Sequence, residues 1–382
     1  MKLVYILNHY SQNSHSHFYH VLHLLEVMAS NGVEVALVIE KCEDIPDVKH
    51  PSIRVIPQVA QGKAGRPLEL FRILRGLHRE GFGHVYIRIS WVAAVVAIVA
   101  GWLTGQKTFY WLSGQGSFEH YQQLRPGWTK WKEWFSSRLP FAFIRQFVYR
   151  FVTGPESMKD YFIKEGKVPA DKITVLYNDI DISRFSMTSP EEKRAIRRTL
   201  GLPEEATIVF FAHRFSPVRR TLFYVPYIFE HIDYQSDIKF IIAGSGPEEA
   251  ELRAAVAQSP VHERVQWTGN IPNAQIHTYY KAADIFINPT YAEGFPRVLI
   301  EAMASGLPIV TTDAGGIKDI VGAEQAAFMV SKDDRAAFAR QLNDLILHPE
   351  MQQVLAAENR QTAQRFSTEA VADMYINAIF GQ

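Results

Sequence analysis

The chain of 382 residues has one cysteine, Cys42, and no long hydrophobic run. A single cysteine excludes an intrachain disulfide and a cysteine-cluster metal site, and it is typical of a reducing compartment. The most apolar stretch, 91–103, is too short to span a bilayer. Residues 1–7 are apolar, but a polar, histidine-rich stretch follows them, which indicates a first strand rather than a signal peptide. We therefore expect a cytoplasmic protein.

The chain also lacks net charge, because 40 Lys and Arg balance 40 Asp and Glu. The balance is uneven along the sequence: residues 1–180 carry 21 basic and 15 acidic residues, and the remainder carries 19 and 25. Two explanations of this asymmetry are equally good. The first half could contact an anionic surface or a phosphorylated acceptor, or the asymmetry could be neutral drift. The apolar content of 47% is ordinary for a globular protein, and the length indicates two domains.

Apolar runs that suit buried strands alternate with helical patterns along most of the chain. This alternation predicts open parallel sheets covered by helices, and such sheets bind ligands at the carboxyl ends of their strands. The stretch 289–316 is the most informative example, with the sequence PTYAEGFPRVLIEAMASGLPIVTTDAGG. It predicts a loop, a helix, a turn at Gly306 and a strand, which together form a parallel crossover.

The loop of this stretch delivers the chain to a helix N-terminus, which suits a phosphate group. Pro296 falls near the first turn of that helix, where a missing N–H costs little. Two carboxylates flank the anion site, Glu293 on the loop and Glu301 inside the helix. Each also has a simpler explanation, since Glu293 could offset the helix dipole and Glu301 could pair with Arg297.

Glu293, seven intervening residues and Glu301, followed by AMASGLPIVTTDAGGI, resemble the signature of the GT4-type family of GT-B glycosyltransferases. In that family the first Glu lies near the donor sugar, the second hydrogen-bonds the nucleotide ribose, and backbone amides between them hold the diphosphate. Pro296 stands where the family usually has Gly, which removes one N–H. The resemblance assigns the diphosphate to the backbone of Gly294, Phe295, Pro296, Arg297 and Val298.

The resemblance implies an α/β fold of the GT-B type, with two Rossmann-like domains whose parallel sheets face each other across a cleft. We expect an acceptor-binding domain over 1–185 and a nucleotide-sugar-binding domain over 186–365. A last helix, 366–382, is expected to pack back on the first domain. The similarity is strong over 206–322 and moderate before 186.

The segment after the strand 206–212 resembles the family pattern of Gly-Arg-Leu with Lys-Gly five residues beyond the Arg. Arg214 matches that Arg, Arg219 stands for the Lys, and His213 and Arg220 replace glycines. Two cations at a strand end can neutralise a nucleotide diphosphate and the charge that builds as it departs. A surface basic cluster is the alternative. Other donor contacts implied by the resemblance are Gly244 and Gly246, in a strand-to-helix turn, and Ile271, in the segment whose backbone reads the base.

The acceptor side departs from the family. The loop after the first strand lacks the usual Gly-Gly turn and holds Ser14, His15 and His17 instead. These histidines have no acidic or cysteine partner nearby, so we favour solvated or acceptor-contacting side chains over a metal site. By the resemblance, Ser113 stands where the family commonly has a His close to the reacting sugar. Gln115, Glu119 and His120 are candidates to substitute for it.

The segment 121–151 holds six Lys or Arg against one acid, with Trp128, Trp131, Trp134 and Phe135 interleaved. This pattern suits the headgroup boundary of an anionic membrane. A core helix with a solvated basic face is the alternative. No base-reading motif accompanies the segment, so we expect no nucleic acid.

The resemblance implies a hexosyltransferase with a UDP- or GDP-linked sugar donor and a saccharide or lipid-linked saccharide acceptor, acting in cell-envelope polysaccharide synthesis. We expect retention of anomeric configuration, no cofactor and no metal, although Asp179-Ile180-Asp181 imitates the metal-binding motif of unrelated GT-A enzymes. Two alternatives stay open: a non-catalytic, membrane-associated nucleotide-sugar-binding subunit, and a GT-B-fold nucleotide-sugar epimerase. The enzyme could lie peripherally on the inner face of the membrane.

Overall fold

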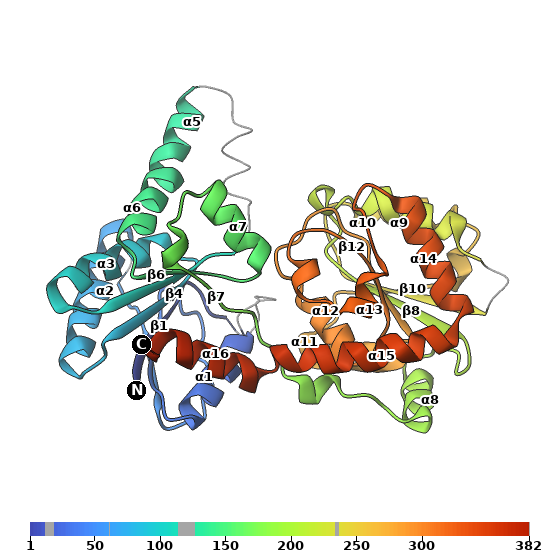
Figure 1. The fold of residues 1–382 in the computed structure, drawn as a ribbon, viewed down its shortest axis with the longest axis horizontal. Coiled ribbons are helices and arrows are strands. Elements are labelled where there is room, and N and C mark those ends of the chain that lie inside the picture. The colour runs from blue at the N-terminus through green and yellow to red at the C-terminus, as the bar shows by residue number, and fades with distance from the viewer. Residues whose placement is uncertain (12–18, 61, 114–126, 234–236, 382) are drawn as a thin grey trace. The chain divides into compact units, whose positions relative to one another are not determined.

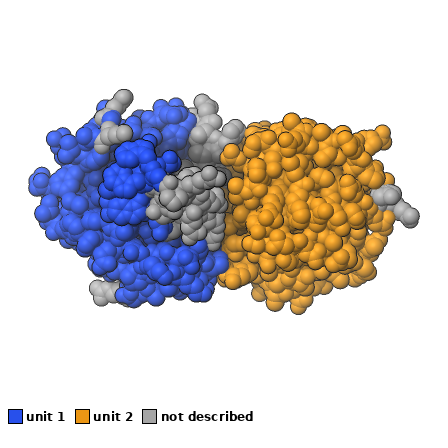
Figure 2. All heavy atoms as spheres, turned by 90° about the horizontal axis from the view of Figure 1, so that it is seen from above, with its two compact units in different colours: residues 1–179, 368–382 blue, residues 180–367 orange. Residues whose placement is uncertain are grey.

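The computed structural model describes residues 1–11, 19–60, 62–113, 127–233 and 237–381. They form two compact units, unit 1 with residues 1–179 and 368–382, and unit 2 with residues 180–367 (Figure 2). The expected boundaries were 185/186 and 365/366. The junction segment belongs to unit 2 because Ile180 N donates to Phe366 O at 2.9 Å and because Phe185 is buried against Tyr280, with ring centroids 5.7 Å apart.

Unit 1 contains a parallel sheet of seven strands in the order β3-β2-β1-β4-β5-β6-β7. The strands are β1 (Lys2–Leu7), β2 (Glu34–Ile39), β3 (Ile53–Pro57), β4 (His84–Arg88), β5 (Lys107–Trp111), β6 (Arg150–Thr153) and β7 (Ile173–Val175). Helices that the structure describes here are α1 (Tyr19–Ser30), α2 (Gly62–Arg79), α3 (Trp91–Thr104), α5 (Trp128–Glu133), α6 (Leu139–Phe147), α7 (Glu156–Lys164) and α16 (Thr368–Phe380).

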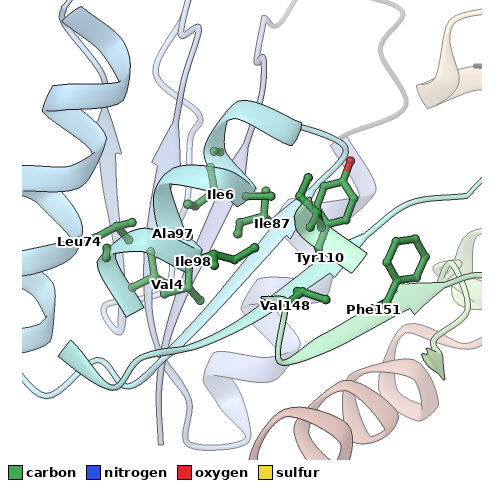
Figure 3. Packing of buried hydrophobic residues seen from close by; sticks show 14 of the residues in the cluster. Val4, Ile6, Leu74, Ile87, Ala97, Ile98, Tyr110, Val148 and Phe151 are labelled. Atoms are coloured by element: carbon green, nitrogen blue, oxygen red, sulfur yellow. The ribbon is translucent and has the colours of Figure 1, made fainter. Parts of the chain in front are cut away.

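Alternate residues of each strand in unit 1 point to opposite faces of the sheet, as the period of a strand requires. Val4 and Ile6 of β1 pack with Leu74 of α2 and with Ile98 of α3 on one face (Figure 3). Tyr5 belongs to the core of the other face, which α1 and α16 cover. The last helix therefore packs on the sheet that contains the first strand, and both chain ends lie in unit 1 (Figure 1).

Unit 2 contains a second parallel sheet, in the order β10-β9-β8-β11-β12-β13. Its strands are β8 (Thr207–Ala212), β9 (Ile238–Ala243), β10 (Val265–Gly269), β11 (Ile285–Asn288), β12 (Ile309–Thr312) and β13 (Met329–Val330). The described helices are α8 (Pro190–Thr199), α9 (Thr221–His231), α10 (Glu249–Val256), α11 (Asn273–Ala282), α12 (Arg297–Ala304), α13 (Ala323–Ala326), α14 (Arg335–Leu347) and α15 (Pro349–Ala363). Two Rossmann-like sheets thus confirm the predicted fold class.

The segment 128–147 forms one continuous helical rod. A π-helical turn, Trp134–Arg138, joins α5 to α6, and Leu139 N bonds to Trp134 O five residues back. The wider turn accommodates Pro140, which lacks an N–H and whose ring would crowd a regular helix. α5 extends away from the sheet of unit 1 (Figure 1). Within the described ranges, no helix is both long and apolar enough to cross a bilayer.

Trp128, Trp131, Trp134 and Phe135 of this rod face solvent, so the alternative that these residues belong to the core is wrong, whereas Phe141 farther along the rod is buried. Trp128 is 74% exposed, Trp131 55% and Trp134 40%. They contact one another along the rod rather than the core: Trp128 stacks on Trp131 with ring centroids 5.3 Å apart, and Phe135 lies 4.4 Å from Trp131.

Candidate active site

The strand order of unit 2 reverses at β8, which lies between β9 and β11. Loops that leave the carboxyl ends of two such neighbouring strands diverge, and ligands of open α/β sheets bind at this position. Here the loops are 213–220 after β8 and 289–296 after β11. The two segments predicted to bind the donor therefore start at adjacent strand ends, although 68 residues separate them in the sequence (from 220 to 289).

The loop after β8 is held by the turn after β9. His213 N donates to Ala243 O at 3.0 Å, and Phe215 N donates to Ser245 O at 3.1 Å. Gly244 has φ +124°, and a Cβ on it would lie 1.8 Å from the carbonyl oxygen of His213. A Cβ on Gly246 would lie 2.0 Å from Phe215 O. Both glycines are thus needed for the close approach of these two loops.

The Glu293 loop is held from two sides. Tyr291 N donates to Arg219 O at 3.0 Å, which joins it to the loop after β8. Gly316 N donates to Gly294 O at 3.0 Å, and Gly315, with φ +57°, leaves room for the carbonyl oxygen of Glu293. These backbone contacts place the side chain of Glu293 beside Arg219.

Glu293, Arg219 and His213 form a charge cluster, the name we keep for these three residues. Arg219 Nη1 donates to Glu293 Oε1 and lies 2.5 Å from His213 Nε2, and that nitrogen lies 3.3 Å from the same Glu293 oxygen. The side chains of Glu293 and His213 are 7% and 1% exposed, whereas that of Arg219 is 29% exposed. The structure therefore brings the predicted Arg219 and Glu293 together and adds His213, which sequence reasoning had noted only as a replaced glycine.

The electrostatics of the cluster follow from its burial. Desolvation lowers the pKa of His213, the neighbouring Glu293 carboxylate opposes this, and the positive charge of Arg219 lowers the pKa further. The ring is consequently neutral at pH 7. A carboxylate removed from water at this depth needs a partner, and the guanidinium of Arg219 provides it.

Arg214, the other cation predicted at this strand end, is exposed. Among the described residues the ion pairs of Glu293 are with Arg219 and His213 and do not include Arg214. The backbone decides which arginine turns inward, because a short 3-10 turn, Pro217–Arg219, carries Arg219 toward β11. The sequence pattern alone does not report that turn.

α12 begins directly after the Glu293 loop, with Pro296 as its N-cap residue at φ −74°. Phe295 and Pro296 are buried, whereas Gly294, Arg297 and Val298 are partly exposed. The backbone predicted to hold the diphosphate therefore lies at the N-terminus of a helix, as the sequence suggested. Pro296 is compatible with that place because N-terminal amides of a helix have no intrahelical partner.

Glu301 lies inside α12 and is 6% exposed. Burial raises its pKa, while Arg297, a hydrogen bond with Tyr280 and the charge of Arg184 oppose this. The Tyr280 hydroxyl, whose single hydrogen is shared, also lies 3.2 Å from Val298 O in the first turn of α12. Sequence reasoning treated Tyr280 only as part of a helix and missed this contact, for which the sequence offers no signal.

The predicted base-reading segment follows β10. Ile271 is half-buried, and Asn270 beside it accepts a hydrogen bond from Ser245 Oγ at 2.9 Å, which ties this segment to the turn after β9. Gly244, Gly246 and Ile271 thus come from adjacent strand ends of one sheet.

The residues of unit 1 that were predicted to contact the acceptor are described only in part. Ser113 is half-buried two residues beyond β5, whereas Ser14, His15, His17, Gln115, Glu119 and His120 lie outside the described residues. Arg88 lies at the end of β4 and is 4% exposed; the sequence reasoning did not assign it to the site. Its guanidinium donates to Asn178 Oδ1 at 2.6 Å and lies 4.2 Å from the ring of Trp111.

The acidic residues that imitate a metal motif have structural roles. Asp179 is buried and accepts from Thr368 Oγ1 at 3.0 Å, and Asp181 caps the turn Ile182–Phe185 through Ser183 N at 3.2 Å. In the part of the chain that the structure describes, no group of three or more His, Cys, Asp or Glu could hold a metal ion.

Two Rossmann-like units, with charged loops at the switch point of the second, define a GT-B type of protein. A family model described as glycosyl transferases group 1 matches residues 192–362, and one described as glycosyltransferase family 4 matches residues 19–184. Together the models span most of both units, and the chain belongs to the GT4-type GT-B glycosyltransferases.

Relatives of known name agree with this family. The chain is 27% identical over 231 residues to the D-inositol 3-phosphate glycosyltransferase of Streptomyces scabiei, which covers 57% of this chain and 51% of that protein. It is 32% identical over 171 residues to the lipopolysaccharide core biosynthesis mannosyltransferase LpsB of Rhizobium meliloti, covering 43% and 48%. The matched part thus spans about half the length of these relatives.

Solved structures resemble the whole chain. HepE of Anabaena in complex with UDP superposes with a TM-score of 0.77 at 20% identity and covers 99% of both chains. WaaG, a glycosyltransferase involved in lipopolysaccharide biosynthesis, superposes with a TM-score of 0.69 at 16% identity, covering 100% of each. At these identities the similarity establishes the fold.

Proposed function

We propose that this protein transfers a hexosyl group from a nucleoside diphosphate sugar to a saccharide or lipid-linked saccharide acceptor in cell-envelope polysaccharide synthesis. The observation that carries the proposal is the contact of Arg219 with the buried Glu293 at the switch point of unit 2. The family and its relatives in envelope biosynthesis support the reaction class, and the UDP bound to HepE supports a uridine nucleotide over GDP.

In the proposed reaction the bond between the anomeric carbon and the diphosphate oxygen breaks, and a bond to the acceptor oxygen forms. The acceptor proton passes to the departing diphosphate, and the new bond forms on the face that the diphosphate leaves, so configuration is retained. Arg219, with Arg214 at the loop surface, stabilises the leaving diphosphate in place of a metal, since fixed charges in a low-dielectric site lower such barriers most. Glu293 holds the sugar, and Glu301 the ribose.

Calorimetric titration with UDP, GDP, ADP and dTDP tests the donor site, and release of nucleoside diphosphate from UDP-glucose or GDP-mannose with candidate acceptors tests the transfer. We expect Glu293→Gln to lower kcat by roughly 10²- to 10³-fold, the cost of one oriented group in such a site. Glu350→Gln, on the exposed start of α15, is the matched control. Chelation by EDTA should leave the rate unchanged.

Three outcomes would point elsewhere. Binding without turnover on any acceptor favours the non-catalytic subunit, and conversion of the nucleotide sugar without an acceptor favours the epimerase. A product of inverted configuration contradicts the retaining route. Failure of all four nucleotides to bind contradicts the proposal as a whole.

We also propose that the helical rod 128–147 docks the protein on an anionic membrane surface. Exposed tryptophans beside Lys132 and Arg138 suit the headgroup region, where each cation contributes about 1 kcal/mol. A cavity of about 180 Å³ at the base of the rod supports this, because Trp134, Arg138 and Arg145 line it together and present apolar and positive groups to one ligand.

Co-sedimentation with vesicles tests the docking. The full chain should bind vesicles that contain phosphatidylglycerol and should not bind vesicles of pure phosphatidylcholine. The double variant Lys132→Glu with Arg138→Glu should bind the anionic vesicles at least tenfold more weakly, because repulsion replaces attraction at two points. Lys49→Glu with Arg72→Glu, exposed elsewhere in unit 1, is the control of equal charge change. If both double variants lose the same amount of vesicle affinity, the loss depends on net charge alone, and this contradicts a docking role for the rod.

A further inference from the structure

His213 has no function in the proposed reaction, yet its ring occupies the centre of the charge cluster. It follows β8 directly, its side chain is 1% exposed, and its ring centroid lies 5.4 Å from that of Phe211. The family pattern that the sequence resembles has a glycine at this place, where this chain has a histidine. The ring touches both groups to which we assign the donor.

A hydrogen bond between Arg219 and His213 requires one particular tautomer of the ring. A guanidinium has N–H donors only, so His213 Nε2 must accept at 2.5 Å from Arg219 Nη1. The ring hydrogen then resides on Nδ1, and Nε2 cannot donate to Glu293 at the same time. Arg219 Nη1 carries two hydrogens, which allows one bond to His213 and one to Glu293. One nitrogen thus bridges an imidazole and a carboxylate.

This bridge matters because, without His213, Glu293 would be the one side chain among the described residues that holds the Arg219 guanidinium. Arg219 ends a short turn after Val218, which is 69% exposed, and a long arginine side chain loses rotamer entropy when it is fixed. A second acceptor restricts the guanidinium before any ligand arrives, and such preorganisation reduces the cost of binding.

We propose that His213 is a positioning residue: its neutral ring accepts from Arg219 and fixes the guanidinium beside Glu293 for the diphosphate of the donor. This inference rests on the proposed function, because the diphosphate is the ligand that the guanidinium would meet. The charged groups that face the ring are Arg219 from the loop after β8 and Glu293 from the loop after β11. Protonation of Nε2 would remove the acceptor and release Arg219.

The first test needs no nucleotide. Nitrogen NMR of the full chain with ¹⁵N-labelled histidine should identify His213, assigned by its loss in H213Q, as the Nδ1–H tautomer. R219M should raise the pKa of His213, because the adjacent cation is gone and Glu293 remains. An Nε2–H tautomer, or a pKa that R219M leaves unchanged, overturns the inference whatever the protein binds.

The second test measures nucleotide affinity by calorimetry with UDP. Gln places its amide oxygen near the position of Nε2, whereas Asn reaches only to Nδ1. We therefore expect H213Q to bind within about threefold of wild type, and H213N and H213L to bind at least tenfold more weakly. If His213 acts through Arg219, H213L with R219M should bind no more weakly than R219M alone. Additive losses, or H213N equal to H213Q, contradict the positioning role even when wild type binds UDP well.

Discussion

Removal of Arg219 alone should destabilise unit 2 more than removal of Arg219 and Glu293 together. Arg219→Met keeps most of the side-chain volume but leaves a carboxylate that is 7% exposed without its cation. Glu293→Gln in the same chain removes that unpaired charge. The two variants separate the cost of an unpaired buried charge from the net value of the ion pair.

The magnitude follows from the burial of the two partners. Breaking a fully buried ion pair costs about 3–5 kcal/mol, mostly because one charge is left in a low-dielectric site. The side chain of Arg219 is 29% exposed, so water can partly replace it, and we expect a loss of about 2–3 kcal/mol in the free energy of unfolding. The double variant should lose under about 1 kcal/mol.

His213 adds a pH dependence to the single variant. Without Arg219 its ring can protonate and pair with Glu293 Oε1, which lies 3.3 Å from Nε2. That raises the pKa of His213, and a histidine with a raised pKa stabilises the fold at low pH and loses this effect as pH rises. The deficit of Arg219→Met should therefore be smaller at pH 6 than at pH 8.

Urea unfolding read by hydrogen exchange of peptides from unit 2 is the suitable assay. Tryptophan fluorescence would mainly report unit 1, because Trp267 is the one tryptophan of unit 2. Arg214→Met is the matched control, since Arg214 is exposed and a surface change of this kind costs under about 0.5 kcal/mol. An Arg219→Met chain as stable as the control, or a double variant no more stable than the single one, would refute the reasoning.

Three further predictions concern the same unit. Gly315→Ala should cost at least about 2 kcal/mol and abolish UDP binding in calorimetry, because its Cβ would lie 1.8 Å from Glu293 O at φ +57°. Gly201→Ala, with φ +66° and nothing within 4 Å of its Cβ, is the control of equal backbone strain and should leave UDP binding intact. Glu301→Gln should raise the free energy of unfolding at pH 8 more than at pH 4. Burial raises the pKa of Glu301, so the wild-type fold loses stability as the carboxyl ionises with rising pH. The same variant should bind UDP about tenfold more weakly, because it loses the proposed ribose contact. In wild type the lowered pKa of His213 means that stability falls as pH drops below the ordinary value of 6.5, and His213→Gln should flatten this slope in urea titrations.

The sequence predicts the elements of the donor half well, because strong local signals mark them. Apolar runs mark β11 and β12, and Gly306, at φ +72°, ends α12 as a C′ glycine does. The resemblance placed Arg219 and Glu293 at the same donor but did not predict their pairing, since 74 positions separate the two residues and only the order of β8 and β11 brings them together. Local pattern does not report strand order.

Other features were hidden because they depend on orientation rather than residue type. The membrane interpretation of 121–151 expected Trp128 and Trp131 to be exposed, but the sequence also allowed a core helix, and only the direction of α5 decides between the two. Arg214 and Arg219 are equivalent as cations in the sequence, and the turn Pro217–Arg219 selects the second. His213 replaces a residue without a side chain, so a resemblance assigns it no partner, and its contact with Arg219 follows only from the geometry.

The charge cluster is poorly explained as a stabilising device. A buried ion pair rarely contributes more than apolar residues of similar volume, and here the histidine also buries an Nδ1 for which the structure shows no hydrogen-bond acceptor among the described residues. Unit 2 has an apolar core on the same strands, including Phe211 of β8 and Ile287 of β11, that could have continued into this space. The contact between the Glu293 carboxylate and the Arg219 guanidinium, at the carboxyl ends of β8 and β11, is better explained by a ligand that completes their hydrogen bonds. Arg219, which alone of the three retains substantial exposure, is then the group through which the ligand enters the cluster, and an anion is the ligand that it selects.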